Sequence, residues 1–296
     1  MDSSESVNVL RLVVSIAVLA YASVLDLRTR KVGNIYWVLL SVFGIVLLPT
    51  QLLIDSRPIE YSLVLVPVLA ILSDVYWDVG EDSRSAKYAP AVKYAVSVVS
   101  IVLLGYLWVE TEYFQYLLAV PVFMLFIVAM YMLDVVRGGA DAKALLALSI
   151  VFPFYPAIGF LPKILPEAAF AEIFFPFTFA VLVTAAVFVA LLPIGFLIKN
   201  LATKEFVFPY GLLGYKMDVG HVKEKHVWMM ENIENGNHVL HTKPRKSEDL
   251  EKETSLLDAA GYKRVWVTPK IPFIVPMTAS LVFTAVVGNF LFLFFK

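Results

Sequence analysis

Four aspartates, Asp26, Asp74, Asp134 and Asp141, lie at the ends of long apolar segments of this sequence or just inside them. A carboxylate at the edge of a bilayer is costly, so each of the four is a candidate functional group. For any one of them, the alternative is a helix-end residue that faces water at the level of the lipid headgroups. Two such carboxylates that lie close together can share and transfer a proton.

Two of the four aspartates stand in a distinctive local context. Asp26 opens the polar stretch 26–34 (DLRTRKVGN), which separates two apolar segments. Asp141 ends the stretch 138–141 (GGAD) and leads directly into a helical pattern. Small residues there let backbone and substrate approach closely, and an aspartate that begins a helix gains from the positive end of the helix dipole.

The remainder of the sequence must hold these groups in a membrane. Of 296 residues, 59% are hydrophobic and 17% are charged, against roughly 45 to 50% and about 25% in soluble domains. This composition excludes a soluble monomeric enzyme and a disordered chain. We therefore predict an all-α polytopic membrane protein with about eight spanning helices, each formed by an apolar run of about 20 residues. The runs are Val7 to Leu25, Ile35 to Ile54, Tyr61 to Trp77, Val92 to Val109, Tyr113 to Leu133, Ala144 to Leu161, Ala171 to Ile198 and Ile271 to Phe295.

The distribution of basic residues predicts the orientation. Of the 24 Lys and Arg residues, 20 fall on one side of the predicted spans, and the short loops alone give eight against four. Basic loops stay in the cytoplasm, so we expect both termini to lie outside the cell membrane. The net charge of −1 gives no indication of a nucleic-acid partner, and a chain without cysteine has no thiolate nucleophile or Cys-ligated zinc.

One polar segment is long enough to form a small domain. We predict a membrane domain over residues 1–199, a cytoplasmic domain over 200–270 and a last spanning helix over 271–296. Within the cytoplasmic segment, Ser247 and Gly261 mark the ends of a predicted helix. The alternation of Val265 and Val267 before Pro269 predicts a strand, so the insert is expected to be α/β.

The predicted topology brings the two motif aspartates to the same face of the membrane. Four predicted spans, an even number, lie between Asp26 and Asp141. Both carboxylates are therefore expected at one depth on the cytoplasmic side, where they can form a catalytic pair.

These motifs resemble those of the GxGD membrane aspartic peptidases that process type IV prepilins and archaeal preflagellins (archaellins). In that family one Asp follows the first helix in a context matched here by residues 26–34, and the other ends the GxGD motif, matched by 138–141. The stretch 266–273 (WVTPKIPF) resembles the archaeal preflagellin branch. Two features depart from the pattern: Ala140 replaces a glycine, and the aspartates are 115 residues apart, as though two spans were inserted.

The resemblance implies an aspartic endopeptidase of the cell membrane that removes a short basic leader peptide from preflagellin-like or prepilin-like precursors, without metal or cofactor. Asp26 and Asp141 would be the catalytic pair, and Gly138, Gly139 and Ala140 would line the gap for the substrate. Candidate supporting residues are Asp134, Arg28, Lys143 and Asn34. The methylation activity of bacterial members, which carry a Cys-rich segment, is not expected here.

Other polar groups carry weaker signals. Asp78, Glu81 and Asp82 lie in an acidic cluster that is either a docking site for the basic leader or a solvated loop. His221, His226, His238 and His241 all fall in the polar insert, with spacing that does not favour zinc.

Two other functional classes compete with the peptidase. A proton- or cation-coupled transporter would use Asp26, Asp134 and Asp141 as a relay, but it predicts inverted repeats and carboxylates near the bilayer midplane. A presenilin-like intramembrane protease would pair its GxGD motif with a Tyr-Asp inside a helix and a Pro-Ala-Leu near the C-terminus. The nearest match to the latter, Tyr155-Pro156-Ala157-Ile158, is not in that place.

Overall fold

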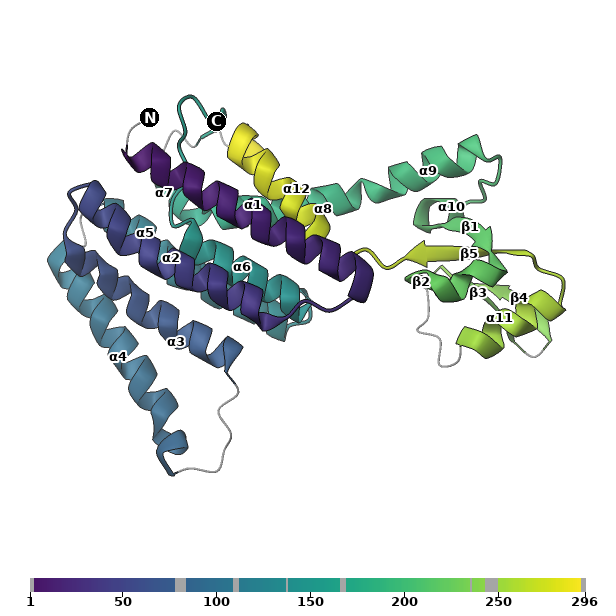
Figure 1. Ribbon diagram of the computed structural model, residues 1–296, viewed down its shortest axis with the longest axis horizontal. Helices are drawn as coiled ribbons and strands as arrows, with labels where there is room; N and C mark the ends of the chain where they lie inside the picture. The colour runs from purple at the N-terminus through teal and green to yellow at the C-terminus, as the bar shows by residue number, and fades with distance from the viewer. Residues whose placement is uncertain are drawn as a thin grey trace. The chain divides into compact units, whose positions relative to one another are not determined.

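The structure is a computed structural model that describes residues 3–77, 84–108, 112–136, 138–165, 169–234, 236–242 and 250–293. The chain divides into two compact units (Figure 1). The first comprises Met1–Ala186 and Pro272–Lys296, and the second comprises Val187–Ile271. Each unit is described by itself.

The first unit is helical in the described part of the chain. Its elements are α1 (Ser3–Thr29), α2 (Asn34–Ile54), η1 (Ile59–Val64), α3 (Leu65–Tyr76), α4 (Arg84–Trp108), α5 (Glu112–Met132), α6 (Gly139–Val151), α7 (Ala169–Phe174), α8 (Phe177–Ala190), α12 (Ile274–Val287) and η3 (Phe290–Leu293).

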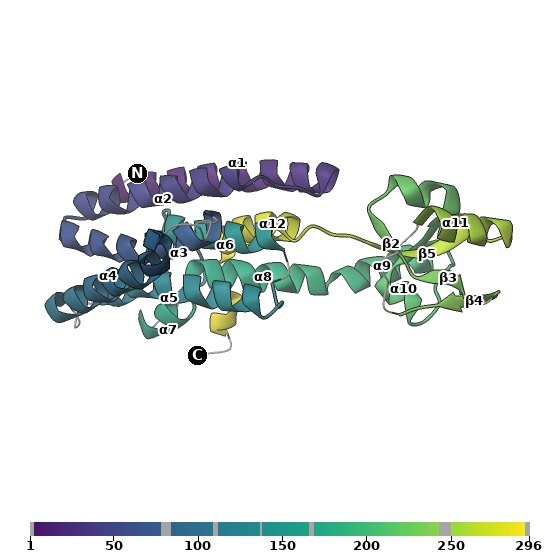
Figure 2. The ribbon, with the colours of Figure 1, turned by 90° about the horizontal axis from the view of Figure 1, so that it is seen from below.

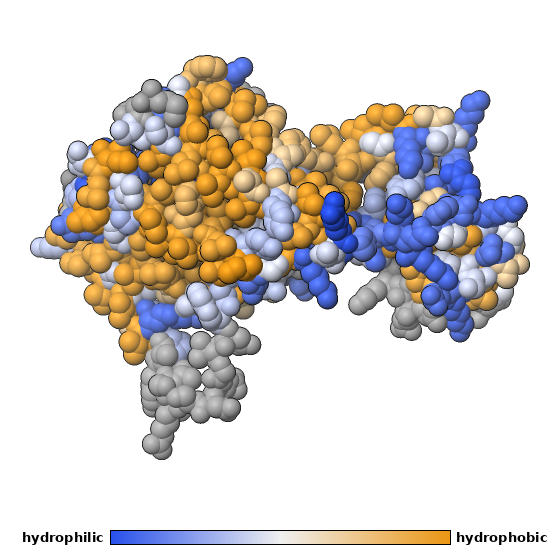
Figure 3. Space-filling view, viewed as in Figure 1, coloured by the Kyte–Doolittle hydropathy of each residue, from blue (hydrophilic) through white to orange (hydrophobic). Residues whose placement is uncertain are grey.

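Six described helical segments are long and apolar enough to cross a bilayer, which makes this a multi-pass membrane protein. They are Ser3–Thr29, Asn34–Ile54, Ile59–Tyr76, Pro90–Leu107, Glu112–Met132 and Phe177–Ala202. Apolar side chains cover most of the visible face of the first unit, as expected for a surface in contact with lipid (Figure 3). The mostly helical prediction is confirmed, whereas the predicted count of about eight spans is not.

Helix α6 explains part of this difference. The predicted span from Ala144 to Leu161 is instead a helix of 13 residues that ends at Val151. Phe152 precedes Pro153, and a residue before proline is pushed out of the helical region, so the helix ends there. Every residue from Ala144 to Val151 is buried. The apolar run therefore reflects a helix enclosed by protein on all sides rather than one that faces lipid.

Helix α12 is also shorter than predicted. It ends at Val287 because Gly288 has φ +93°, a left-handed conformation that favours glycine. A side chain at Gly288 would overlap the backbone of Ile164, with which Gly288 forms an isolated β-bridge. The end of α12 is thus fixed by the loop that follows α6.

Packing in the first unit centres on α6. Helix α2 lies along α6, and a side chain at Gly44 of α2 would come within 2.8 Å of the backbone nitrogen of Val151. Helix α1 packs against α12 and α2 and also contacts α6. Figure 2 shows α1 along the top of the bundle, α6 and α12 below it, and α5 near the lower edge. The close approach at Gly44 fixes where α2 and α6 cross.

The second unit contains the small sheet that lies before the last helix. It comprises α9 (Leu192–Ala202), α10 (Tyr210–Leu213), β1 (Tyr215–Asp218), η2 (Val219–Glu224), β2 (Val227–Met229), β3 (Glu231–Glu234), β4 (Asn237–Leu240), α11 (Leu250–Ala259) and β5 (Arg264–Pro269). β5 pairs antiparallel with β1 on one side and β2 on the other, and β3 with β4 forms a hairpin.

The predicted helix and strand of the insert are confirmed. Helix α11 is followed by Gly261 at φ +87°, and β5 places Val265 and Val267 in a small core with Leu257. Ser247, the predicted start of the helix, lies outside the described residues.

Two of the four histidines are held within the β3–β4 hairpin. His238 forms a 2.7 Å hydrogen bond with Glu231 and stacks on Tyr262, and His241 forms a 3.1 Å hydrogen bond with Asn232. In the part of the chain that the structure describes, no group of three or more His, Asp or Glu residues is arranged to hold a metal ion.

Candidate active site

Asp26 lies in the last turn of α1, and its side chain is half-buried. Helix α1 ends just beyond it because Arg30 adopts φ +57° while its amide still donates a 3.0 Å hydrogen bond to the Asp26 carbonyl. The Thr29 hydroxyl accepts a 3.3 Å hydrogen bond from the Lys31 amide in the following turn. The motif 26–34 thus folds as a helix end and a short connection, and α2 begins at Asn34.

Asp141 lies in the first turn of α6. The helix begins directly after Gly138, which has an extended backbone (φ −84°, ψ 113°). The Gly138 carbonyl accepts the amide of Ala142 at 3.0 Å, which starts the helix. The Asp141 carboxylate folds back over Gly138 and occupies the space that a β-carbon at that position would need. A side chain at position 138 would therefore displace the Asp141 carboxylate from the place that it occupies.

Asp26 and Asp141 lie close enough for their charges to interact. Helices α1 and α6 are in contact, and the negative charge of Asp26 acts on the Asp141 carboxyl. Asp141 itself lies outside the six apolar spans. Burial of the Asp141 carboxyl, and after it the charge of Asp26, raises the pKa of Asp141 to about 7. Two neighbouring carboxyls that share one proton near neutral pH can act as acid and base.

The candidate supporting residues divide into two groups. Lys143 of α6 donates a 2.8 Å hydrogen bond to the side-chain oxygen of Asn34 at the start of α2. The second motif is therefore joined to the first. Arg28 and Asp134 are exposed, and Asp134, at φ +56°, lies in the turn that closes α5. A short polar residue such as aspartate tolerates that left-handed conformation.

Gly139 and Ala140 are partly buried in the first turn of α6. A β-carbon at Gly139 would lie 3.5 Å from the hydroxyl of Tyr131, which is an ordinary contact distance. Gly139 is thus less constrained than Gly138.

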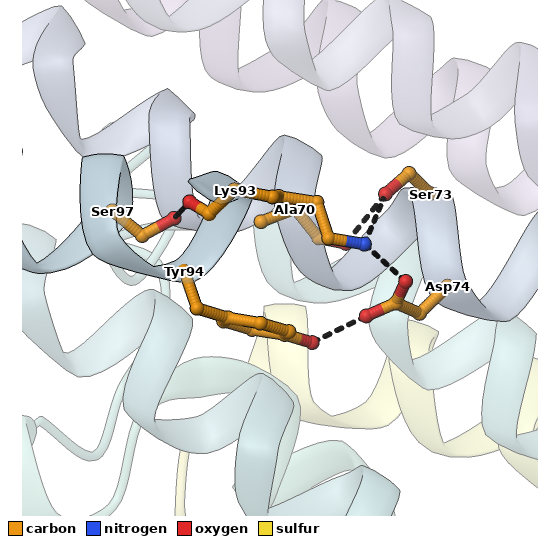
Figure 4. Close-up of polar contacts among 6 residues, drawn as sticks. All are labelled: Ala70, Ser73, Asp74, Lys93, Tyr94 and Ser97. Atoms are coloured by element: carbon orange, nitrogen blue, oxygen red, sulfur yellow. Dashed lines mark hydrogen bonds and ion pairs between the residues drawn. The ribbon is translucent and has the colours of Figure 1, made fainter. Parts of the chain in front are cut away.

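Asp74 has a different environment from the motif aspartates (Figure 4). Its carboxylate forms an ion pair with Lys93 of α4 and accepts a hydrogen bond from Tyr94. Lys93 also donates a 3.1 Å hydrogen bond to Ser73. These contacts join α3 to α4 and neutralise the charge of Asp74. Asp78, Glu81 and Asp82 lie outside the described residues.

Two residues near the site, Tyr76 and Ser41, could not be recognised as part of it from the sequence. The Tyr76 hydroxyl of α3 donates a 3.5 Å hydrogen bond to the backbone carbonyl of Lys143 and lies 3.1 Å from the Ser41 hydroxyl of α2. Tyr76 ends an apolar run in which any large residue fits the pattern. Its role becomes visible only when α2, α3 and α6 are placed together.

Comparison with known proteins shows what this chain is similar to. A family model described as "Archaeal Peptidase A24 C-terminus Type II" matches residues 207–290. A preflagellin peptidase of Methanocaldococcus jannaschii is 26% identical over 218 residues, which cover 70% of this chain and 88% of that protein. A preflagellin peptidase of Methanococcus maripaludis is 23% identical over 283 residues, 92% of each chain.

The apolar spans and these relatives define the chain as a membrane-embedded protease. It is similar to archaeal preflagellin peptidases over 70% to 92% of its length.

Proposed function

We propose that this protein is an aspartic endopeptidase that removes the basic leader peptide from preflagellin-like precursors, with Asp26 and Asp141 as its catalytic residues. The observation that carries the proposal is the electrostatic interaction of these two carboxyls, which come from contacting helices, in a chain whose relatives are preflagellin peptidases. The same relatives favour a protease over the transporter class.

The mechanism follows from a shared proton. Two adjacent carboxyls do not both ionise easily, so one stays protonated while the other accepts a proton from a water held between them. The water oxygen attacks the scissile carbonyl carbon, and the protonated carboxyl donates its proton to the carbonyl oxygen. The C–N bond then breaks as the proton taken from water passes to the leaving nitrogen, and a hydroxyl proton of the tetrahedral intermediate returns to the carboxylate that donated first. The pair titrates as a unit, so acid and base are not assigned to single residues.

Processing of a precursor tests the proposal directly. Membranes that contain the protein are incubated with an archaellin precursor, and the product is identified by N-terminal sequencing. A new N-terminus at the junction between the basic leader and the hydrophobic segment supports the proposal. Absence of cleavage, with the protein present and a known preflagellin peptidase active in parallel, contradicts it.

The pH dependence of cleavage follows from the raised pKa of Asp141. Below about pH 7 the Asp141 carboxyl holds a proton, and above about pH 7 it loses that proton. We therefore expect kcat/KM to fall as the pH rises through about 7, because the pair then has no proton to donate. The measurement is the rate of precursor cleavage between pH 5 and 9. A rate that stays constant to pH 9 would contradict the shared-proton mechanism.

The orientation proposed for the membrane domain places the active site on the cytoplasmic side, with both termini outside. It is supported by the excess of Lys and Arg in alternate loops, with α6 counted as a crossing that is enclosed by protein. A reporter fused after Lys246 should be cytoplasmic, and one inserted between Arg57 and Tyr61 should be outside. Accessibility labelling of both fusions checks this prediction. The opposite labelling would place the two aspartates on the wrong face for a leader that stays in the cytoplasm.

A further inference from the structure

Lys143 is contacted through both its side chain and its backbone by other helices. Its ammonium group donates a 2.8 Å hydrogen bond to Asn34, 109 residues away in the sequence. Its carbonyl accepts the hydroxyl of Tyr76, which also pairs with Ser41. Three helices, α2, α3 and α6, therefore meet at the residue that lies two positions after Asp141.

These contacts lie at one end of the α2–α6 interface. Towards the other end, the close approach of Gly44 to the backbone at Ile150 and Val151 holds the same two helices together. A helix held at two separated points cannot pivot about either one. The Lys143–Asn34 bond therefore fixes the first turn of α6, which carries Asp141.

Asn34 is also connected to the other carboxylate. Only the short connection that begins at Arg30 separates the end of α1, which carries Asp26, from the start of α2 at Asn34. Asn34 is thus close in the sequence to Asp26, and its hydrogen-bond partner Lys143 lies two residues after Asp141. Lys143 points towards α2, whereas Asp141 folds back over Gly138. Any effect of Lys143 on the site would therefore pass through the position of α6 rather than through a contact with the Asp141 carboxyl.

We infer that the Lys143–Asn34 hydrogen bond is a positioning clasp that holds Asp141 at the correct distance from Asp26 for their shared proton. The inference rests on the proposed peptidase function and extends it to two positioning residues. Tyr76 supports the same clasp from α3, which gives the helices between the two motifs a role in catalysis.

Precursor cleavage by purified full-length variants tests the clasp. Lys143→Met and Asn34→Leu should each lower kcat about tenfold and leave KM nearly unchanged, because the substrate still binds while the carboxyls are misplaced. Lys143→Arg and Asn34→Asp, which keep a donor and an acceptor, should restore most of kcat. The double variant Lys143→Met/Asn34→Leu should be no slower than the slower single variant, since both remove one interaction. Lys225→Met, which removes an exposed lysine from the insert, is the matched control and should retain wild-type kcat.

A wild-type kcat in both Lys143→Met and Asn34→Leu, or additive losses in the double variant, would overturn the clasp. Failure of the wild type itself to cleave would instead overturn the proposed function. The clasp then remains testable, because the chain has no native cysteine and accepts paired spin labels. Labels at the exposed positions Ile35→Cys and Val135→Cys report the distance between the start of α2 and the turn before α6. Lys143→Met should broaden this distance distribution, and an unchanged width would contradict the clasp.

Discussion

Replacement of Asp26 or Asp141 by Asn is expected to reduce precursor cleavage by roughly 1,000-fold or more, the scale of loss for residues that act as a catalytic unit. Asparagine matches aspartate in size, so each variant should insert and accumulate normally. It has no carboxyl, however, and so cannot take part in proton exchange with its partner. The double variant should be little worse than either single variant, because the first substitution already removes the shared proton.

The matched control for these substitutions is Asp134→Asn. Asp134 is exposed in the turn that closes α5, seven residues before Asp141, and we expect at most a partial loss of cleavage. Cleavage is measured under single-turnover conditions, with each variant quantified in the membrane. Retained turnover in Asp26→Asn or Asp141→Asn, or an equally severe loss in Asp134→Asn, would show that the catalytic pair has been assigned wrongly.

Much of this candidate site could be predicted from local sequence. Asp26 and Asp141 each stand at a helix end, next to residues whose size and charge mark the position, and the even number of intervening spans places both on one face. The helix before Gly261 and the strand at Val265 were predictable for the same reason. Their patterns depend on neighbours in the chain.

The rest could not be predicted because it depends on contacts between distant segments. The apolar run after Asp141 has the composition of a lipid-facing span, and only packing on all sides shows that α6 is an enclosed helix of 13 residues. Similarly, Asp74 carries a charge in an apolar run, and its partner Lys93 becomes apparent only when α3 and α4 are paired. The apolar pattern of the sequence does not distinguish Tyr76 from any other aromatic residue, because the partners of its hydroxyl lie on other helices.

The second large effect is expected at Gly138. The sequence alone indicates that small residues at 138–140 keep a gap open for the substrate, which would make all three positions sensitive to added bulk. The structure gives a more specific reason at Gly138, because a β-carbon there would overlap the Asp141 carboxylate. The carboxylate must then move, and a displacement of about 1 Å in a catalytic group can cost about 100-fold in rate. We therefore expect Gly138→Ala to lose about 100-fold in kcat, and Gly138→Val to lose more.

The neighbouring glycine distinguishes the two explanations, because Gly139→Ala adds the same methyl group one residue further along the chain. That methyl would lie 3.5 Å from the Tyr131 hydroxyl, a distance that needs no rearrangement, and alanine favours the helical conformation of this first turn. Gly139→Ala should therefore lose far less kcat than Gly138→Ala, and Ala140→Gly should be neutral or beneficial. The measurement is kcat and KM for one precursor with each variant. If Gly138→Ala and Gly139→Ala raise KM equally and leave kcat unchanged, the glycines serve only to admit the substrate. A loss of kcat confined to Gly138→Ala would instead show that this glycine provides the space in which the Asp141 carboxylate is held beside Asp26.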